Sequence, residues 1–228
     1  MNNLKAFDLF SGSQSFATWA RSKNIQVWTL DILDIQGAKP DFIGDYMDMD
    51  IKKDPPFVPD IIWASPDCAA FSIAAASLHF DSRSNKPKTE KAEKAIRLIE
   101  KLIEDIKHIL SINPECRFYI ENPVGKLQFL ECMKPGFFNP IPNFKVWKID
   151  QCQYGREFKK PTHIFTNATT PFNKILTCKN PNKCHHYKGD GGLSDVFSTS
   201  KGKTPSASAP YYQRAKIPFN LFENLIEL

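Results

Sequence analysis

The feature that most constrains the fold is the apolar run Ile61–Ala64, which ends abruptly in Ser65-Pro66-Asp67. Four consecutive apolar residues bounded by turn residues predict a short, buried β-strand. Such a strand fits an open α/β sheet, in which ligands bind at the carboxyl ends of the strands. Cys68 follows at that end, so it is a candidate nucleophile. An ordinary buried cysteine is the alternative interpretation of this window.

The N-terminal region predicts a strand, a tight turn and a helix. Lys5–Phe10 is the first strand, Ser11–Ser15 the turn, and Phe16–Ala20 the start of the helix. A small-residue turn before a helix N-terminus suits a nucleotide-like ligand, because backbone N–H groups and the helix dipole point at it. The turn contains one glycine and no dinucleotide fingerprint, and a plain βα turn is the alternative.

The next two predicted strands each end in an acid. Gln26–Asp31 is the second strand, and Asp41–Tyr46 contains a third, short one with Asp45 at its end. An acid about 20 residues beyond the glycine turn often binds ribose hydroxyls. Asp31 and Asp45 are therefore candidates for ligand binding at the same edge of the sheet, and helix N-capping is the alternative.

After Cys68, residues 72–88 are predicted to form a long, basic loop with Arg83, Lys86 and Lys88. Loops of this length are usually functional or disordered. From Thr89 onward apolar residues recur every three or four positions, which predicts an amphipathic core helix that ends near Asn113.

Three further strands are predicted in the second half: Arg117–Pro123, residues 145–150 and residues 162–167. Glu121 and Asn122 lie at the carboxyl end of the first of these strands. Residues 151–161 connect the last two and contain three basic residues, which could contact phosphate or simply form a solvated turn.

Charge is distributed unevenly along the 228 residues. Residues 151–228 have 11 Lys and Arg against 5 Asp and Glu, a net charge of +6, whereas residues 1–150 have 19 against 20, a net charge of −1. A basic C-terminal third fits a polyanionic partner such as nucleic acid.

No apolar span is long enough for a transmembrane helix, and the N-terminus leaves no room for a signal peptide. We therefore expect an intracellular protein whose six cysteines are reduced thiols, metal ligands or catalytic groups.

Residues 168–210 are polar and lack periodicity. Cys178, Cys184 and His185 lie within them at a spacing that suits part of a tetrahedral zinc site, with Cys152 as the candidate fourth ligand. His186 is an equal alternative to His185, and unremarkable cysteines with exposed histidines are an equal alternative to the metal site.

Four motifs, taken in order, resemble those of DNA (cytosine-5)-methyltransferases, of the compact kind found in phages and prophages. Asp8–Gly12 resembles the motif that holds S-adenosylmethionine, Ser65–Ser72 the catalytic Pro-Cys motif, and Glu121–Pro123 the motif that grips the target cytosine. Tyr154-Gly155 and Lys159–Thr162 lie where the family has an Arg-x-Arg pair. The compact relatives also share the Cys-Gln-Tyr-Gly and Cys-x5-Cys-His pattern of the candidate zinc ligands.

The chain departs from the family's motifs at several positions. Asp67 stands where the family has the proline before the cysteine, Ala69 replaces a glutamine and Pro123 a valine. Lys160 is the nearest counterpart of the missing arginines.

The resemblance implies a Rossmann-like S-adenosylmethionine-dependent methyltransferase sheet with a small irregular second lobe. It divides the chain into a catalytic domain (1–167), a basic, target-facing lobe (168–210) and a C-terminal segment that packs back on the catalytic domain (211–228). It implies Cys68 as nucleophile, Glu121 as the acid at cytosine N3 and Lys160 as a catalytic cation. The residues implied for cofactor binding are Phe10, Ser11, Gly12, Asp31, Asp45, Tyr46 and Pro66.

The expected reaction is methyl transfer to C5 of a cytosine flipped out of DNA, through a covalent cysteine adduct. We expect a monomer without membrane attachment, in the host cytoplasm if a phage encodes it. Three alternatives remain open: an RNA cytosine-5 methyltransferase, a methyltransferase of free cytosine nucleotides, and a catalytically impaired nucleic-acid-binding homologue.

Overall fold

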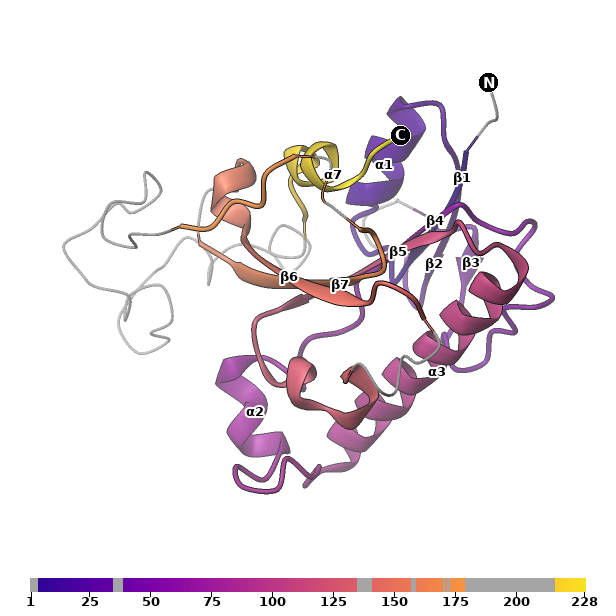
Figure 1. Cartoon of the computed structure of the whole chain (residues 1–228). Helices are drawn as coiled ribbons and strands as arrows, with labels where there is room; N and C mark the ends of the chain where they lie inside the picture. Colours follow the sequence, from indigo (N-terminus) through magenta and orange to yellow (C-terminus); the bar gives the residue numbers. More distant parts are fainter. Residues whose placement is uncertain are drawn as a thin grey trace.

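A seven-stranded sheet with the strand order β3-β2-β1-β4-β5-β7-β6 forms the centre of the molecule (Figure 1). The computed structural model describes residues 4–34, 39–134, 141–156, 159–169, 171, 173–178 and 216–228. The strands are β1 (Lys5–Leu9), β2 (Gln26–Asp31), β3 (Phe42–Ile43), β4 (Ile61–Ala64), β5 (Arg117–Pro123), β6 (Lys145–Asp150) and β7 (Pro161–Thr166).

The first five strands run parallel, so that the carboxyl ends of β1, β2, β4 and β5 meet at one edge of the sheet. Strand β7 is antiparallel to both of its neighbours, β5 and β6. The predicted α/β sheet is therefore confirmed. The third strand is shorter than the predicted window, because only Phe42 and Ile43 pair with β2.

Helices cover both faces of the sheet (Figure 1). On one face lie α1 (Ser15–Ser22) and α7 (Phe219–Leu225), and on the other lies α3 (Glu90–Ile112). The α7 residue Phe222 packs edge-on against Trp63 of β4, with ring centroids 4.8 Å apart. Both side chains are fully buried, and burying one Phe side chain contributes about 1.5–3 kcal/mol. Residues 216–228 are thereby fixed to the face that α1 covers.

The long helix α3 forms where the apolar periodicity predicted it. Its N-cap Thr89 accepts a hydrogen bond from the backbone N–H of Ala92 at 3.3 Å, and Glu90 and Glu93 lie in the first turn, where the helix dipole favours negative charge. The residues of α3 that are buried in the core are Ala92, Ile99, Leu102, Ile103, Ile106 and Ile109.

Residues 72–88 do not form the predicted loop throughout. Ile73–His79 forms helix α2, and Phe80 and Pro87 then pair as an isolated antiparallel bridge. The physical reason is local: three alanines and a leucine favour helix, and Ser72 in an extended conformation begins it. The described part of the chain also contains three short 3₁₀ segments: η1 (Lys126–Phe129), η2 (Glu131–Met133) and η3 (Gln151–Tyr154).

None of the described helices combines the length and the apolar character that a membrane span requires. Most of residues 168–210 lies outside the described residues, so the second lobe remains a prediction.

Candidate active site

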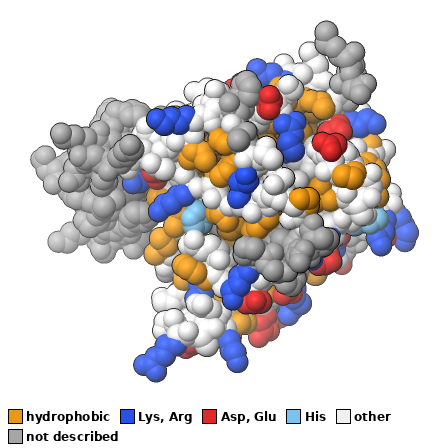
Figure 2. All heavy atoms as spheres, in the orientation of Figure 1, with side chains coloured by type: hydrophobic (Ala, Val, Ile, Leu, Met, Phe, Trp, Pro, Cys, Tyr) orange, Lys and Arg blue, Asp and Glu red, His pale blue; other side chains and the backbone are white. Residues whose placement is uncertain are grey.

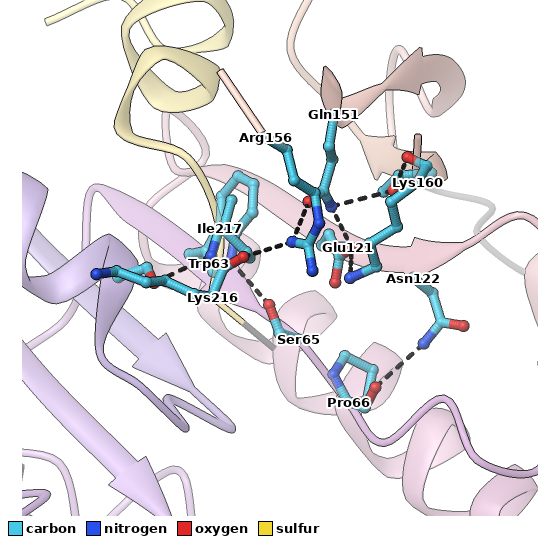
Figure 3. Close-up of polar contacts among 12 residues, drawn as sticks. Trp63, Ser65, Pro66, Glu121, Asn122, Gln151, Arg156, Lys160, Lys216 and Ile217 are labelled. Carbon is cyan, nitrogen blue, oxygen red and sulfur yellow. Dashed lines mark hydrogen bonds and ion pairs between the residues drawn. The ribbon is translucent and has the colours of Figure 1, made fainter. Parts of the chain in front are cut away.

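Cys68 lies in the turn after β4, and the start of this turn is hydrogen-bonded to both neighbouring strands, β1 and β5. Ser65 N–H donates to Leu9 O of β1 at 3.1 Å. Asn122 Nδ2 of β5 donates to Pro66 O at 3.1 Å (Figure 3). The Cys68 carbonyl accepts hydrogen bonds from the N–H groups of Phe71 and Ser72. The thiol is therefore presented at the carboxyl ends of β4 and β5 by a turn with a defined conformation.

A glycine on the chain after β5 allows a close approach to this turn. Gly125 pairs with Ser72, and Lys126 N–H donates to Phe71 O at 2.7 Å. A Cβ atom at Gly125 would lie 2.2 Å from Phe71 O, so no other residue fits there without movement of the backbone. The sequence predicts neither this contact nor the role of Gly125.

Three charged groups act on the Cys68 thiol. Burial, the largest cause, raises its pKa, and Glu121 and Asp67 raise it further, whereas the positive charge of Lys160 lowers it. The structure thus brings together the three residues predicted to be catalytic, which come from the β4 turn, from β5 and from the residue before β7. Lys160 is the cation that favours the thiolate, the form in which a cysteine is nucleophilic.

Glu121 is held in a buried network of polar side chains (Figure 3). Its Oε1 accepts hydrogen bonds from Lys160 Nζ at 3.2 Å and from Gln151 Nε2 at 3.0 Å. Gln151 also accepts from Arg156 Nη1 at 2.9 Å. The Glu121 side chain is only 6% exposed, so the ion pair with Lys160 is shielded from solvent.

The C-terminal segment closes this network on the side of α1. Arg156 Nη1 donates to Lys216 O at 2.6 Å, and Ile217 N–H donates to the Ser15 hydroxyl at 3.1 Å (Figure 3). Residues about 200 positions apart in sequence are therefore joined at the start of α1, next to the predicted cofactor turn.

The backbone of the predicted cofactor turn is left-handed at Phe10 and Gly12, and at Phe10, which has a side chain, this conformation is strained. Phe10 and Gly12 have φ angles of 58° and 47°, and Gly12 N–H donates to Asp31 Oδ2 at 2.7 Å. Ser11 Oγ is buried and has no hydrogen-bond partner among the described residues. An unpaired buried hydroxyl, a backbone with positive φ and a fixed carboxylate fit a polar ligand in this turn.

Asp45 and Tyr46, also predicted to bind the cofactor, differ in accessibility. Asp45 is exposed and lines a cavity of about 560 Å³, together with Asp67, Phe71 and residues from the N-terminal half of α3. Tyr46 is buried, and its hydroxyl donates to Asp105 Oδ2 at 2.7 Å. The Tyr46 ring packs on the Phe10 ring with centroids 4.8 Å apart, and this contact stabilises the turn that contains Phe10.

Two described members of the candidate zinc set lie in segments that are joined by hydrogen bonds. Cys178 N–H donates to Asp150 Oδ2 at 2.6 Å, and Leu176 N–H donates to the Tyr154 hydroxyl at 2.9 Å. Cys152 lies in η3, between Asp150 and Tyr154. The other predicted ligands, Cys184 and His185, lie outside the described residues, and within the described ranges no cluster of three or more His, Cys, Asp or Glu could hold a metal.

Basic side chains are distributed between apolar ones on the face shown in Figure 2. In the segment after α2, Arg83, Lys86 and Lys88 are all exposed. Lys159, in contrast, is only 18% exposed and lies 3.8 Å from Asp150 Oδ1. The sequence alone did not distinguish the accessible cations from the one that is already paired.

The sequence interpretation missed two features of the site. Gln151 is fully buried beside Glu121, and no sequence signal marks it. Ile32 and Leu33, directly after Asp31, are 58% and 61% exposed. The sequence shows that both residues are apolar but not that they are exposed, and exposed apolar side chains after a strand-end acid fit contact with an apolar ligand group.

Comparison with known proteins gives one relative that matches over the full length. A protein of Frog virus 3 (isolate Goorha), named probable DNA (cytosine-5)-methyltransferase, is 24% identical over an alignment of 233 positions that covers 99% of this chain and 100% of the relative. No family model matches the chain.

Solved structures of methyltransferases are similar in fold. The Entamoeba histolytica methyltransferase EhMeth has a TM-score of 0.53 and 16% identity over 79% of this chain and 58% of that one. The S. pombe Dnmt2 methyltransferase has a TM-score of 0.47 and 14% identity over 88% of this chain and 55% of that one. The chain thus spans less than two thirds of each of these structures. The predicted resemblance to DNA (cytosine-5)-methyltransferases and the predicted Rossmann-like methyltransferase fold are both confirmed.

Proposed function

We propose that this protein transfers a methyl group from S-adenosylmethionine to C5 of a cytosine that is flipped out of DNA. The observation that carries the proposal is the convergence of Cys68, Glu121 and Lys160 at the carboxyl ends of β4 and β5. The relative that is named probable DNA (cytosine-5)-methyltransferase, and that matches over its full length, supports it.

Cys68 is the nucleophile in this proposal. Carbon 5 of cytosine is a weak nucleophile, and addition of the Cys68 thiolate to C6 makes C5 enamine-like. Burial raises the pKa of the Cys68 thiol, so thiolate formation depends on the nearby charge of Lys160. After methylation, the C5 proton is lost to solvent water, the C5–C6 double bond re-forms and the C6–S bond breaks, which returns Cys68 as a thiolate.

Glu121 is the acid in this proposal. Addition at C6 puts negative charge on the ring, and a proton held at N3 by the Glu121 carboxyl neutralises it. Lys160, 3.2 Å from Glu121, adds a fixed positive charge beside the ring. Because both groups are largely buried, their effect on the ring is screened little by water.

The turn after β1 and the ends of β2 and β3 would hold the cofactor. Ser11 and Gly12 would face its polar end, Asp31 its ribose hydroxyls and Asp45 its adenine amino group, with Phe10, Tyr46 and Pro66 framing the site. The unpaired Ser11 hydroxyl and the cavity beside Asp45 support this fit. When bound, S-adenosylmethionine supplies an electrophilic methyl group for C5 to accept.

The exposed basic residues Arg83, Lys86 and Lys88 would contact the phosphate backbone, together with the basic C-terminal third. A base inside a duplex cannot reach Cys68, so the target must be flipped out. Phosphate contacts release counterions, so we expect DNA affinity to fall steeply with salt. An affinity that stays flat between low and physiological salt contradicts this placement.

We place the protein, as a monomer, in the compartment of its DNA, the host cytoplasm if a phage encodes it.

Side-by-side transfer of a labelled methyl group to duplex DNA, structured RNA and dCMP tests the proposal. We expect label on C5 of cytosine in duplex DNA, and a covalent complex with DNA that contains 5-fluorocytosine. Cys68→Ala removes both and leaves cofactor affinity unchanged. An adduct that persists in Cys68→Ala refutes the assignment of the nucleophile.

The same assay separates the alternatives. Transfer to RNA or to dCMP, but not to duplex DNA, identifies that molecule as the substrate in place of DNA. Cofactor binding with no transfer to any of the three favours a nucleic-acid-binding homologue, for which Asp67 and Ala69 in the catalytic motif are the supporting observation.

A further inference from the structure

Gln151 is a fully buried polar residue at the start of η3, directly after β6. Its side chain reaches across β7 toward β5. Nε2 donates to Thr162 Oγ1 at 3.1 Å and to Glu121 Oε1 at 3.0 Å, and Oε1 accepts from Arg156 Nη1 at 2.9 Å. The amide is therefore hydrogen-bonded to three side chains, and one of them is the proposed acid Glu121.

Arg156 determines which way round the Gln151 amide lies. An arginine has only donors, so the oxygen of the amide must face it, and the NH₂ group must face Glu121. Arg156 is itself anchored, since Nη1 also donates to Lys216 O at 2.6 Å. Burial lowers the pKa of Arg156 to about 10, which leaves the guanidinium charged at neutral pH.

This orientation makes the two oxygens of Glu121 different. Oε1 accepts from two donors, Gln151 Nε2 and Lys160 Nζ. Among the described residues Oε2 has no hydrogen-bond or ion-pair partner, and it is not among the fully buried unpaired atoms. An oxygen whose lone pairs serve two donors is a poor place for a proton, so protonation is directed to Oε2.

We propose that Gln151, oriented by Arg156, is a positioning residue that holds Glu121 Oε1 as an acceptor and directs the transferable proton to Oε2. The inference rests on the proposed function, because it assigns a proton to the acid of that reaction. Gln151 itself touches neither the substrate nor the cofactor in this scheme.

The experiment compares the parent protein with Gln151→Leu and Gln151→Glu. The readouts are the single-turnover rate of adduct formation with 5-fluorocytosine DNA, the KM for DNA, and cofactor affinity. In Gln151→Leu, Oε1 loses a donor, and we expect the adduct rate to fall at least about tenfold, as for a misplaced general acid. The KM for DNA and the cofactor affinity stay within about twofold of the parent values, because binding groups are intact.

The pH dependence of Gln151→Glu gives a second, independent readout. A protonated Glu at this position has one O–H donor, which can still donate to Glu121 although not also to Thr162 as the amide does, whereas an ionised one has no donor and repels Glu121. We expect the ratio of variant rate to parent rate to rise as pH falls from about 8 to about 5.5. The other charged groups nearby, Glu121, Lys160, Arg156 and Cys68, are present in both proteins, so a pH dependence that the two proteins share does not change this ratio.

Gln153→Leu is the matched control, because it makes the same change two residues away, where Nε2 lies near Cys152 rather than Glu121. We expect it to form the adduct at the parent rate. Equal adduct rates in Gln151→Leu and Gln153→Leu overturn the inference while leaving the proposed function intact. If Gln151→Leu does not fold, a pH-independent ratio for Gln151→Glu overturns it instead. A parent protein that forms no adduct and transfers no methyl group overturns both proposals together.

Discussion

Lys160 Nζ lies 3.2 Å from Glu121 Oε1, and these two groups act on the Cys68 thiol in opposite directions. After burial, which raises the pKa of the thiol most, Lys160 lowers it and Glu121 raises it. The ion pair thus places a cation where it favours the Cys68 thiolate, and in the proposed reaction its carboxyl group is the acid for the ring nitrogen. Removal of either partner leaves the other charge buried and unpaired, which costs more than the pair itself is worth.

The first prediction concerns alkylation of Cys68 by iodoacetamide, followed as a function of pH by peptide mass spectrometry. Only the thiolate reacts, so the midpoint of the profile reports the thiol pKa, which we expect above the ordinary value of 9.0. Lys160→Met removes the charge that lowers the pKa, so its midpoint moves to higher pH. Glu121→Gln removes a charge that raises it, so its midpoint moves to lower pH. Displacement of both midpoints in the same direction contradicts the arrangement, and Cys68→Ala identifies the reacting peptide.

The second prediction concerns Asp31, which fixes the cofactor turn through Gly12 N–H and also accepts from Leu33 N–H at 3.1 Å. Asp31→Ala leaves the Gly12 donor unpaired and removes the proposed ribose acceptor. We expect calorimetry with S-adenosylmethionine to show binding weakened by about 1–3 kcal/mol, the usual cost of an unpaired polar group. The exposed Asp34 provides a matched control, and Asp34→Ala binds as the parent does. Unaltered affinity in Asp31→Ala refutes the assigned role.

The third prediction concerns Gly125, whose missing side chain allows the contact with the turn that carries Cys68. In Gly125→Ala the new methyl group would lie 2.2 Å from Phe71 O, a backbone atom that cannot turn aside. We expect a loss of about 1–3 kcal/mol in the free energy of unfolding, as for other overpacked sites. For a chain of this size that loss lowers Tm by about 2–4 °C per kcal/mol.

Gly44→Ala is the control for this experiment. Its added methyl group would approach a ring carbon of Phe42 at 2.8 Å, and a side chain can rotate away. If Gly125→Ala lowers Tm no more than Gly44→Ala does, the turn after β4 adapts to the added methyl group, and Gly125 is not required for its conformation.

The strands were predictable because their signal is local. Ile61–Ala64 is a continuous apolar run, and β2 ends at Asp31 as the sequence indicated. The same local signal placed Cys68 and Glu121 at strand ends, and parallel pairing then brings such ends together. Helix α2 was missed because polar and small residues around it resemble a loop, although the alanines within it favour helix.

The polar network of the site was not predictable, because it depends on which strands become neighbours. Gln151 reaches Glu121 only because β7 lies between β6 and β5 in the sheet and brings Thr162 between them. The contact of Arg156 with Lys216 O spans 60 residues, and that of Ile217 with Ser15 spans 202. No periodicity or spacing in the sequence encodes contacts at these separations.

The last prediction is that one structural zinc ion is bound by Cys152, Cys178, Cys184 and His185. Residues 168–210 have few apolar side chains with which to form a core, and a metal is a common substitute for one. The hydrogen bonds from Cys178 to Asp150 and from Leu176 to Tyr154 place Cys178 beside the turn that carries Cys152. Elemental analysis of the purified protein is expected to give about one zinc ion per chain, the stoichiometry of a closed structural site. Cys178→Ser lowers the zinc content and Tm, because metal binding and folding are coupled, whereas Cys68→Ala, which changes a cysteine outside the set, retains the metal. A folded, active protein with only a trace of zinc would leave the four residues as ordinary thiols and an imidazole.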